Sequence, residues 1–219
     1  FPIDDFAPGR ELMVEQQMRR PPDGRRPITD PRVLEAMACV PRHRFVAPRL
    51  QSQAYDDNPL PIGHGQTISQ PYIVALMTEA VQPQPGFRAL DIGTGSGYQA
   101  AVLAELVKEV YSIEIVGPLA REAAGRLDLL GYENVEVRHG DGYQGWPEMA
   151  PFDVIVVAAA PTEIPQPLID QLAVGGRLVI PVGAERQELV VIEKLVDGSL
   201  RRSSIAGVRF VPMTGEGWE

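Results

Sequence analysis

The pattern of hydrophobic and polar positions changes character near residue 82. Before this point the spacing is helical, and it predicts helices over 9–20, 29–40 and 70–81. In the last of these, apolar side chains recur at i, i+3, i+4 and i+7, at Ile73, Leu76, Met77 and Ala80. The stretch 55–67 is rich in proline and glycine and predicts an ordered loop.

After residue 82, short apolar runs alternate with amphipathic ones. The apolar runs predict strands over 87–93, 110–114, 135–140, 152–160 and 177–183. The amphipathic runs predict helices over 97–107, 118–131 and 164–176. This alternation is typical of a parallel sheet that is covered on both faces. Two final runs, 188–198 and 199–212, predict an antiparallel pair joined by a turn.

We therefore expect an α/β fold with a doubly wound, mostly parallel sheet, a helical N-terminal segment and antiparallel C-terminal strands. The length of 219 residues suits a single domain over 1–219. Within it we distinguish an N-terminal helical and loop segment (1–80), a core (81–198) and a C-terminal segment (199–219) that covers the cleft. In such folds the ligand crevice lies at the carboxyl ends of the strands, where the strand order reverses.

Composition narrows the possible partners. The formal net charge of −9 argues against a broad face for nucleic acid, because phosphate binding needs clustered Lys and Arg. No apolar run is long enough to span a bilayer. A single cysteine, Cys39, leaves no internal disulfide and fits a reducing compartment. We thus expect a cytoplasmic protein, monomeric, that binds neither nucleic acid nor membrane.

A glycine-rich turn, DIGTGSGY, follows the first strand of the core. Gly93, Gly95 and Gly97 let the backbone turn tightly and approach a ligand. The dinucleotide fingerprint would need a third glycine at position 98, where Tyr98 stands. Asp91 just before the turn would repel a pyrophosphate, but it suits a cofactor that carries positive charge. S-adenosylmethionine (AdoMet), with its amino group and sulfonium, is such a cofactor.

Acidic residues end three successive strands at the edge where the crevice is expected. Besides Asp91, these are Glu114, which could accept both hydroxyls of an adenosine ribose, and Asp141, which with Gly142 could meet an adenine amino group. The alternative is that each is a helix cap or turn residue, since aspartate favours both. Taken together with the glycine turn, the three indicate cofactor binding.

Ser69 stands in GQTISQP, directly before the helix predicted at 70–81. Its hydroxyl could cap that helix, with Pro71 in the first turn. It could equally face a substrate, because a helix N-terminus is a modest anion site. The residues themselves leave both roles open, and one hydroxyl serves both only in part.

At this point a family resemblance emerges. The chain resembles the protein-L-isoaspartate O-methyltransferases of bacteria and archaea over nearly its whole length. The segments that carry the resemblance are VLEAMACVPRHRFV, AYDDNPLPIGHGQTISQPYIVALMTE, ALDIGTGSGYQAAVLAEL, GDGYQGWPEMAPFDVIVVAAAP, LIDQLAVGGRLVIPVG and FVPMTG. GQTISQP is the discriminating one, since many methyltransferases share the glycine turn. The resemblance implies a Rossmann-like AdoMet-dependent core that methylates the free α-carboxylate of L-isoaspartyl residues in damaged proteins and peptides.

The resemblance also implies roles for individual residues. Ser69 matches the serine regarded as catalytic, and Ile68, Ser69 and Val211 match positions that lie against the substrate. The implied cofactor contacts are Gln66, Thr67, Ile68, Ser69, Asp91, Gly93, Thr94, Gly95, Glu114, Asp141, Gly142 and Thr214. Tyr143 and Trp146 either wall the adenine pocket or simply pack.

The chemistry makes few demands on side chains. A carboxylate nucleophile with a pKa of about 3.5–4 is ionised at pH 7, so no general base is needed. No set of His, Cys, Asp and Glu has metal-ligand spacing, so we expect no metal. Three alternatives remain to be weighed. The missing third glycine and the position of Asp91 argue against an NAD(P)-dependent oxidoreductase, and the acidic chain without a Pro-Cys dipeptide argues against a nucleic-acid methyltransferase. Ser69 and its loop argue against a non-catalytic AdoMet sensor, which only turnover excludes.

Overall fold

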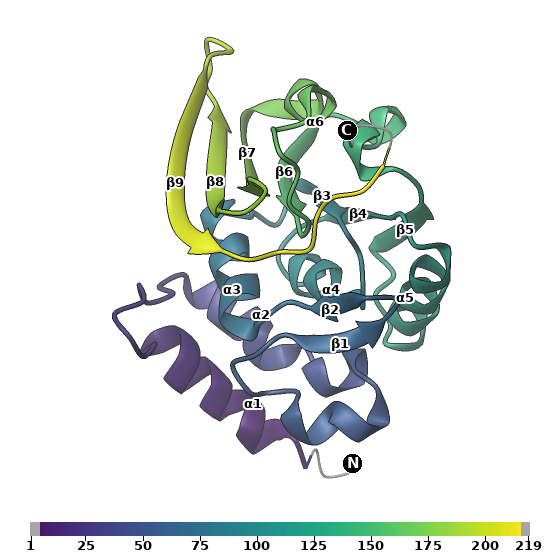
Figure 1. Cartoon of the computed structure of the whole chain (residues 1–219). Coiled ribbons are helices and arrows are strands. Elements are labelled where there is room, and N and C mark those ends of the chain that lie inside the picture. Colours follow the sequence, from purple (N-terminus) through teal and green to yellow (C-terminus); the bar gives the residue numbers. More distant parts are fainter. Residues whose placement is uncertain (1–4, 216–219) are drawn as a thin grey trace.

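The central feature of the computed structural model, which describes residues 5–215, is one seven-stranded sheet (Figure 1). In spatial order its strands are β5 (Val135–His139), β4 (Glu109–Glu114), β3 (Arg88–Ile92), β6 (Phe152–Val157), β7 (Leu172–Val182), β8 (Gln187–Lys194) and β9 (Leu200–Val208). The first five run parallel, and β8 and β9 are antiparallel. The predicted doubly wound sheet with its antiparallel closing pair is confirmed.

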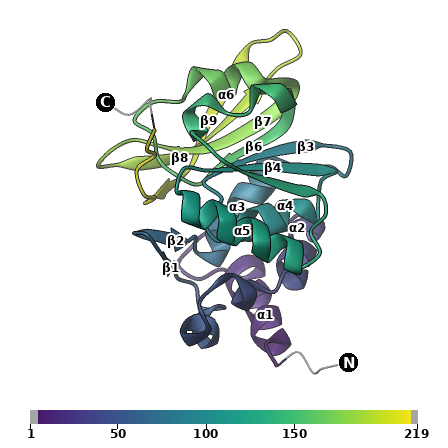
Figure 2. The same cartoon turned by 90° about the vertical axis from the view of Figure 1, so that its right-hand side faces the viewer.

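Helices cover both faces of this sheet, as Figure 2 shows. One face carries α2 (Pro31–Cys39), α3 (Pro71–Ala80), α4 (Tyr98–Ala104) and α5 (Gly117–Leu129), and α6 (Gln166–Gln171) lies on the other. At the N-terminal end, α1 (Ala7–Met13) continues into a π-helical turn, η1 (Val14–Arg19). Shorter 3₁₀ turns are η2 (Arg42–Phe45), η3 (Pro48–Gln53), η4 (Gly142–Gln144) and η5 (Pro147–Met149).

Alternating residues of the central strands supply two separate hydrophobic clusters. Ala89 and Val154 pack with α2, α3 and α4, whereas Leu90 and Ile155, their neighbours in the chain, pack toward α6. All four are fully buried, because successive side chains of a strand point to opposite faces. A strand buried on both sides has to be apolar throughout, which is why the periodicity of this core could be recognised.

The stretch predicted as an ordered loop, 55–67, instead holds a small hairpin. Strands β1 (Leu60–Gly63) and β2 (Gln66–Ile68) pair antiparallel and form a separate two-stranded sheet. His64 and Gly65 form its turn with φ of 53° and 72°, the left-handed conformation that tight two-residue hairpin turns require. The prediction was wrong here because strands of four and three residues are too short to show a period.

The predicted helix 164–176 is also shorter in the structure. Helix α6 ends at Gln171, and Leu172 already pairs with Phe152 in the sheet. A register shift follows, in which Gly175 has φ 81° and Gly176 lies too close to the carbonyls of Ala173 and Asp153 for a side chain. These glycines therefore form a bulge within β7 rather than a helix stop.

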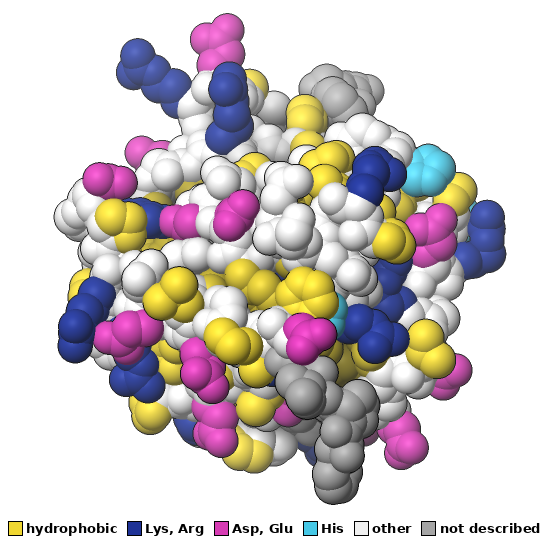
Figure 3. Space-filling view, turned by 90° about the horizontal axis from the view of Figure 1, so that it is seen from below, with side chains coloured by type: hydrophobic (Ala, Val, Ile, Leu, Met, Phe, Trp, Pro, Cys, Tyr) yellow, Lys and Arg dark blue, Asp and Glu magenta, His cyan; other side chains and the backbone are white. Residues whose placement is uncertain are grey.

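Two features of the surface bear on partners. Within residues 5–215, no helix has the length and apolar character needed to cross a membrane. On the face seen in Figure 3, acidic and basic side chains are interspersed and no broad basic area gathers.

Candidate active site

A cavity of about 1120 Å³ opens at the carboxyl ends of the parallel strands. It lies where the strand order reverses, between β3 and β6, as expected for a doubly wound sheet. Its lining brings together eleven of the predicted site residues: Gln66, Thr67, Ile68, Ser69, Gly93, Thr94, Gly95, Glu114, Gly142, Val211 and Thr214. Asp91 and Asp141, the other two, do not line it.

The glycine turn forms the floor of the cavity. Gly93, Gly95 and Gly97 have φ of 87°, 53° and 90°, so all three adopt the left-handed conformation that glycine permits. A Cβ on Gly95 would lie 3.2 Å from the Cδ1 atom of Ile62 in β1. The hairpin therefore closes directly over the turn, and any side chain at position 95 would have to displace it.

Glu114 is the buried carboxylate of the cavity, with 5% of its surface exposed. It ends β4, and its Oε2 accepts a hydrogen bond from the Gly95 N–H at 2.7 Å, while Oε1 accepts one from the Val116 N–H at 2.9 Å. A carboxylate has about four acceptor positions, so two remain for a ligand. This arrangement fits a pair of vicinal hydroxyls on a ribose.

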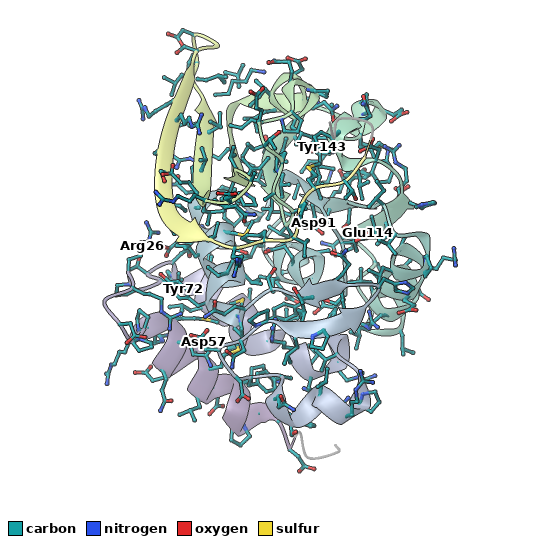
Figure 4. The ribbon with its side chains drawn as sticks, viewed as in Figure 1. Arg26, Asp57, Tyr72, Asp91, Glu114 and Tyr143 are labelled. Carbon is teal, nitrogen blue, oxygen red and sulfur yellow. The ribbon has the colours of Figure 1, made fainter. Side chains whose placement is uncertain are left out.

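Asp91 lies beneath the turn, and Figure 4 shows it beside Glu114. It is fully buried, and the Ser112 hydroxyl donates to its Oδ2 at 2.7 Å. Its Oδ1 has no hydrogen-bond partner among the described residues. Burial raises the pKa of Asp91 to about 7, the bond from Ser112 opposes this, and the charge of Glu114 adds to it. Asp91 is therefore separated from the cavity by the turn that forms its floor.

Asp141 and Gly142 were predicted together to contact the adenine, but only Gly142 lines the cavity. Asp141 caps η4, and its side chain accepts from the Tyr143 N–H at 2.9 Å. Gly142 lines the cavity. A Cβ at this position would clash with the Ile92 side chain and lie 3.1 Å from the Cε atom of Met213. Only glycine keeps this part of the cavity open.

The structure decides whether Ser69 caps the helix. Helix α3 begins at Pro71, and its N-cap is Gln70, with no side-chain cap. Ser69 comes one residue earlier, half-buried on the cavity wall, and its hydroxyl makes no hydrogen bond among the described residues. Val74 is the first residue to bond back, to the Gln70 carbonyl at 3.1 Å. The capping alternative is therefore wrong, and Ser69 lies just before the first helical turn, whose N–H groups have no partner within the helix.

The far wall of the cavity is formed by residues 209–214, called here the roof segment, which cross the ends of the strands after β9 (Figure 1). The Ala160 N–H donates to the Val211 carbonyl, and the Met213 N–H donates to the Ala160 carbonyl, both at 2.8 Å. The Tyr143 hydroxyl donates to the Met213 carbonyl at 3.3 Å. Val211 and Thr214 are thereby held at the cavity.

The sequence left open whether Tyr143 and Trp146 wall the adenine pocket or pack, and both pack in a hydrophobic cluster. Trp146 is 4% exposed and contacts Tyr111 edge-on, with the Arg138 guanidinium 4.1 Å from its ring centroid. Tyr143 is buried as well, and neither residue lines the cavity. One lining residue that sequence reasoning missed is Gln187, the first residue of β8. No motif singles it out, because its contact is made across the fold.

The charged residues on the cavity wall are few. They are Glu114, Arg186, Glu188 and Arg209, and no histidine or lysine of the described chain lines the cavity. Among residues 5–215 no cluster of His, Cys, Asp and Glu could hold a metal ion. The site is suited to position reactants and lacks an obvious side chain for proton abstraction.

Comparison with known proteins agrees with this geometry. The family model "Protein-L-isoaspartate(D-aspartate) O-methyltransferase" matches residues 15–217. The protein-L-isoaspartate O-methyltransferase of Gloeobacter violaceus is 58% identical over 93% of this chain and 98% of its own length. That of a Synechococcus species is 56% identical, covering 96% of this chain and 87% of that protein.

Solved structures show the same likeness. A Plasmodium falciparum structure, described as a protein-L-isoaspartate O-methyltransferase in complex with S-adenosyl-L-homocysteine, superposes with a TM-score of 0.79 at 28% identity. The match covers 94% of this chain and 98% of that chain.

Proposed function

The chain belongs to the protein-L-isoaspartate(D-aspartate) O-methyltransferase family, and we propose that its cavity uses Ser69 to orient the substrate carboxylate. The protein is an AdoMet-dependent enzyme that methyl-esterifies the free α-carboxylate of L-isoaspartyl residues in damaged proteins and peptides. The ester opens a route to repair through a succinimide. One observation carries the role of Ser69: it lines the cavity, and its hydroxyl has no hydrogen-bond partner among the described residues.

The residues present fit AdoMet. Glu114 offers free acceptor positions for the ribose hydroxyls, and the open backbone at Gly93–Gly95 suits the methionine end. Gly142 leaves room for the adenine beside Met213. Gln66, Thr67 and Ile68 of the hairpin and Thr214 of the roof segment complete the contacts that we propose. When bound, AdoMet supplies an electrophilic methyl group on a sulfonium.

Asp91 contributes charge from below. Its carboxyl group is buried under the turn and is not neutralised by a cation among the described residues. A positively charged ligand over the turn favours the ionised form of Asp91, because opposite charges attract strongly away from water. The side chain therefore selects for a cationic cofactor without touching it.

At the substrate side of the cavity, the reaction requires that the carboxylate be oriented but requires no general base. A carboxylate acceptor is already ionised at pH 7, which agrees with the lack of histidine or lysine in the described lining. Proximity and orientation of two reactants are together worth roughly 7–11 kcal/mol. An arginine clamp on the reacting oxygen would stabilise the ground state as much as the transition state. A hydroxyl donor such as Ser69 is milder and suits the partial loss of charge.

The test compares two peptides that are identical except for L-isoaspartate in one and L-aspartate in the other, with methyl-labelled AdoMet. We expect base-labile label on the isoaspartyl peptide alone. Ser69→Ala should lower kcat roughly tenfold, the typical loss for one mild hydrogen-bond donor. The affinity for S-adenosyl-L-homocysteine should stay within about twofold of the wild-type value. Ser52→Ala, an exposed serine in η3, is the matched control. Near-full turnover by a folded Ser69→Ala would refute the role of Ser69.

The remaining expectations concern the state of the protein in the cell. We propose a single cooperative domain, since one hydrophobic cluster joins residues of segment 1–80 to strands of the core. We also propose a cytoplasmic monomer that acts on isoaspartyl proteins and peptides and binds neither nucleic acid nor membrane. The single cysteine and the net charge of −9 support this. Light scattering after gel filtration and one unfolding transition would support it, while a stable dimer would refute the monomer.

A further inference from the structure

The roof segment leaves the sheet after β9, and a few hydrogen bonds hold its backbone over the cavity. Its downstream part is held twice by Ala160 and once by Tyr143, through Val211 and Met213. Its upstream part, at Phe210, has a different anchor. The N–H and the carbonyl of Phe210 both bond to a single side chain, that of Gln187.

Gln187 acts as an added peptide group. Its Oε1 accepts from the Phe210 N–H at 2.6 Å, and its Nε2 donates to the Phe210 carbonyl at 3.1 Å. Gln187 and Val208 are the last paired residues of the β8–β9 ladder. The side-chain amide thus extends the pairing by one step beyond the point where the strands end. A planar carboxamide is suited to this because it carries a donor and an acceptor side by side.

Gln187 is itself held in place by the loop before it. Gly183 has φ 126°, and a Cβ there would clash with the Arg186 carbonyl, so the loop closes tightly just ahead of Gln187. The Gly183 N–H donates to the Pro161 carbonyl at 3.0 Å. Pro161 adjoins Ala160, which binds the roof segment. The Gln187 anchor and the Ala160 anchor of the roof segment are therefore connected through Gly183 and Pro161.

We propose that Gln187 is a positioning residue for the peptide substrate: it holds Phe210 and so, together with the Ala160 N–H, keeps Val211 at the substrate side of the cavity. The proposal rests on the function proposed above and on the expectation, implied by the family resemblance, that Val211 lies against the substrate. Met213, which precedes Thr214 at the cofactor side, is downstream and keeps its bonds to Ala160 and Tyr143. Loss of Gln187 thus loosens the substrate side and spares the cofactor side.

Three variants separate these effects. Gln187→Ala removes both bonds, Gln187→Glu keeps the length and the acceptor but loses the donor, and Gln187→Asn tests whether a shorter amide can rescue. Gln166→Ala is the matched control, because Gln166 is also a surface amide with a side-chain bond, to Asp170, away from the cavity. The measurements are KM and kcat with the isoaspartyl peptide, the Kd of S-adenosyl-L-homocysteine by calorimetry, and the rate of trypsin cleavage after Arg209 by mass spectrometry.

For Gln187→Ala we expect the KM for the peptide to rise roughly tenfold. The Kd of S-adenosyl-L-homocysteine and the kcat at saturating peptide should change less than about twofold. Cleavage after Arg209 should accelerate, and Gln187→Glu should show smaller changes in the same direction. An unchanged KM and unchanged cleavage in a folded variant would overturn the proposal, as would equal losses in peptide and product binding. If wild-type protein fails to label the peptide, the proposed function falls, while the cleavage rates still test the anchoring itself.

Discussion

The cofactor side and the substrate side of the cavity are built in different ways. The floor of the cavity and its cofactor wall are formed by consecutive strand ends between Asp91 and Gly142. Polar side chains there are fixed by hydrogen bonds such as the two that Glu114 accepts. The substrate side joins Ser69 to the roof segment, which lies some 140 residues further along the chain. There the Ser69 hydroxyl makes no hydrogen bond among the described residues, and the Phe210 backbone is bonded to a single side chain.

This difference suggests a division of tasks. A cofactor of constant shape is served by a rigid, pre-formed pocket, whose bonds exist before the ligand arrives. Peptide substrates vary in sequence, and only the backbone around the isoaspartate is common to them. Segments with few internal bonds can adapt to such substrates. Side chains of the cofactor side should therefore govern stability and cofactor affinity, and those of the substrate side should govern turnover and peptide KM.

The largest effect is expected at Asp91. Its pKa of about 7 in the native state exceeds the ordinary value of 3.8, so between these pH values the native protein binds more protons than the unfolded chain. Its contribution to stability therefore falls as the pH rises from about 4 to about 7, by at most about 4 kcal/mol at roughly 1.4 kcal/mol per pH unit. Asp91→Asn lacks this slope. Urea unfolding of both proteins without cofactor, at several pH values, measures the difference.

That difference should favour Asp91→Asn increasingly as the pH approaches 7. Glu79, whose pKa is lowered by bonds from the Asp30 and Thr29 N–H groups and from Arg26 in spite of its burial, changes stability in the opposite direction. Its contribution is present in both proteins and cancels. A pH-independent difference would show that Asp91 is ionised throughout and that its burial is less costly than inferred here.

A change at Glu114 tests the cofactor side directly. Glu114→Ala removes the acceptor of two backbone N–H groups and, by proposal, of the ribose hydroxyls. We expect the Kd of S-adenosyl-L-homocysteine to rise about 100-fold, since an unsatisfied charged hydrogen-bonding site is costly. Glu122→Gln, on the exposed surface of α5, is the control. A Kd within threefold of wild type would remove Glu114 from the site.

A pair of glycines sharpens the comparison. Gly142→Ala places a methyl group against Ile92 and Met213, and we expect a loss of about 1–3 kcal/mol in stability together with weaker cofactor binding. Gly125→Ala, inside α5 with nothing within 4 Å, should instead gain about 0.5–1 kcal/mol. Thermal and urea unfolding check both. Equal changes in stability would mean that the backbone preference of glycine, and not the shape of the cavity, determines the effect of both substitutions.

The smallest effect on stability is expected at Ser69. Because its hydroxyl neither caps α3 nor bonds elsewhere in the described structure, Ser69→Ala should change the free energy of unfolding by less than about 0.5 kcal/mol. The same variant is expected to lose most of its turnover. Calorimetric unfolding beside the peptide assay measures both, and a clear loss of stability would show that the hydroxyl is structural.

Sequence reasoning was most successful where one periodicity extends over many residues. The core strands, the glycine turn and the position of Glu114 at the end of β4 were all predicted correctly. It failed at the hairpin 60–68, whose strands are too short for a period, and at 172–176, where glycines bend a strand. It also placed Asp91 on the cavity surface, whereas the structure buries it beneath the turn.

The sequence by itself determined the order of strands and helices, the family, the cofactor class and the residues of the glycine turn, because all of these depend on neighbours in the chain. Only the tertiary structure decided that Ser69 is not a cap, that Trp146 packs in the core and that Gln187 holds Phe210. These outcomes depend on which surfaces meet across the fold. A side chain's partner in space leaves no periodic trace in the chain that carries it.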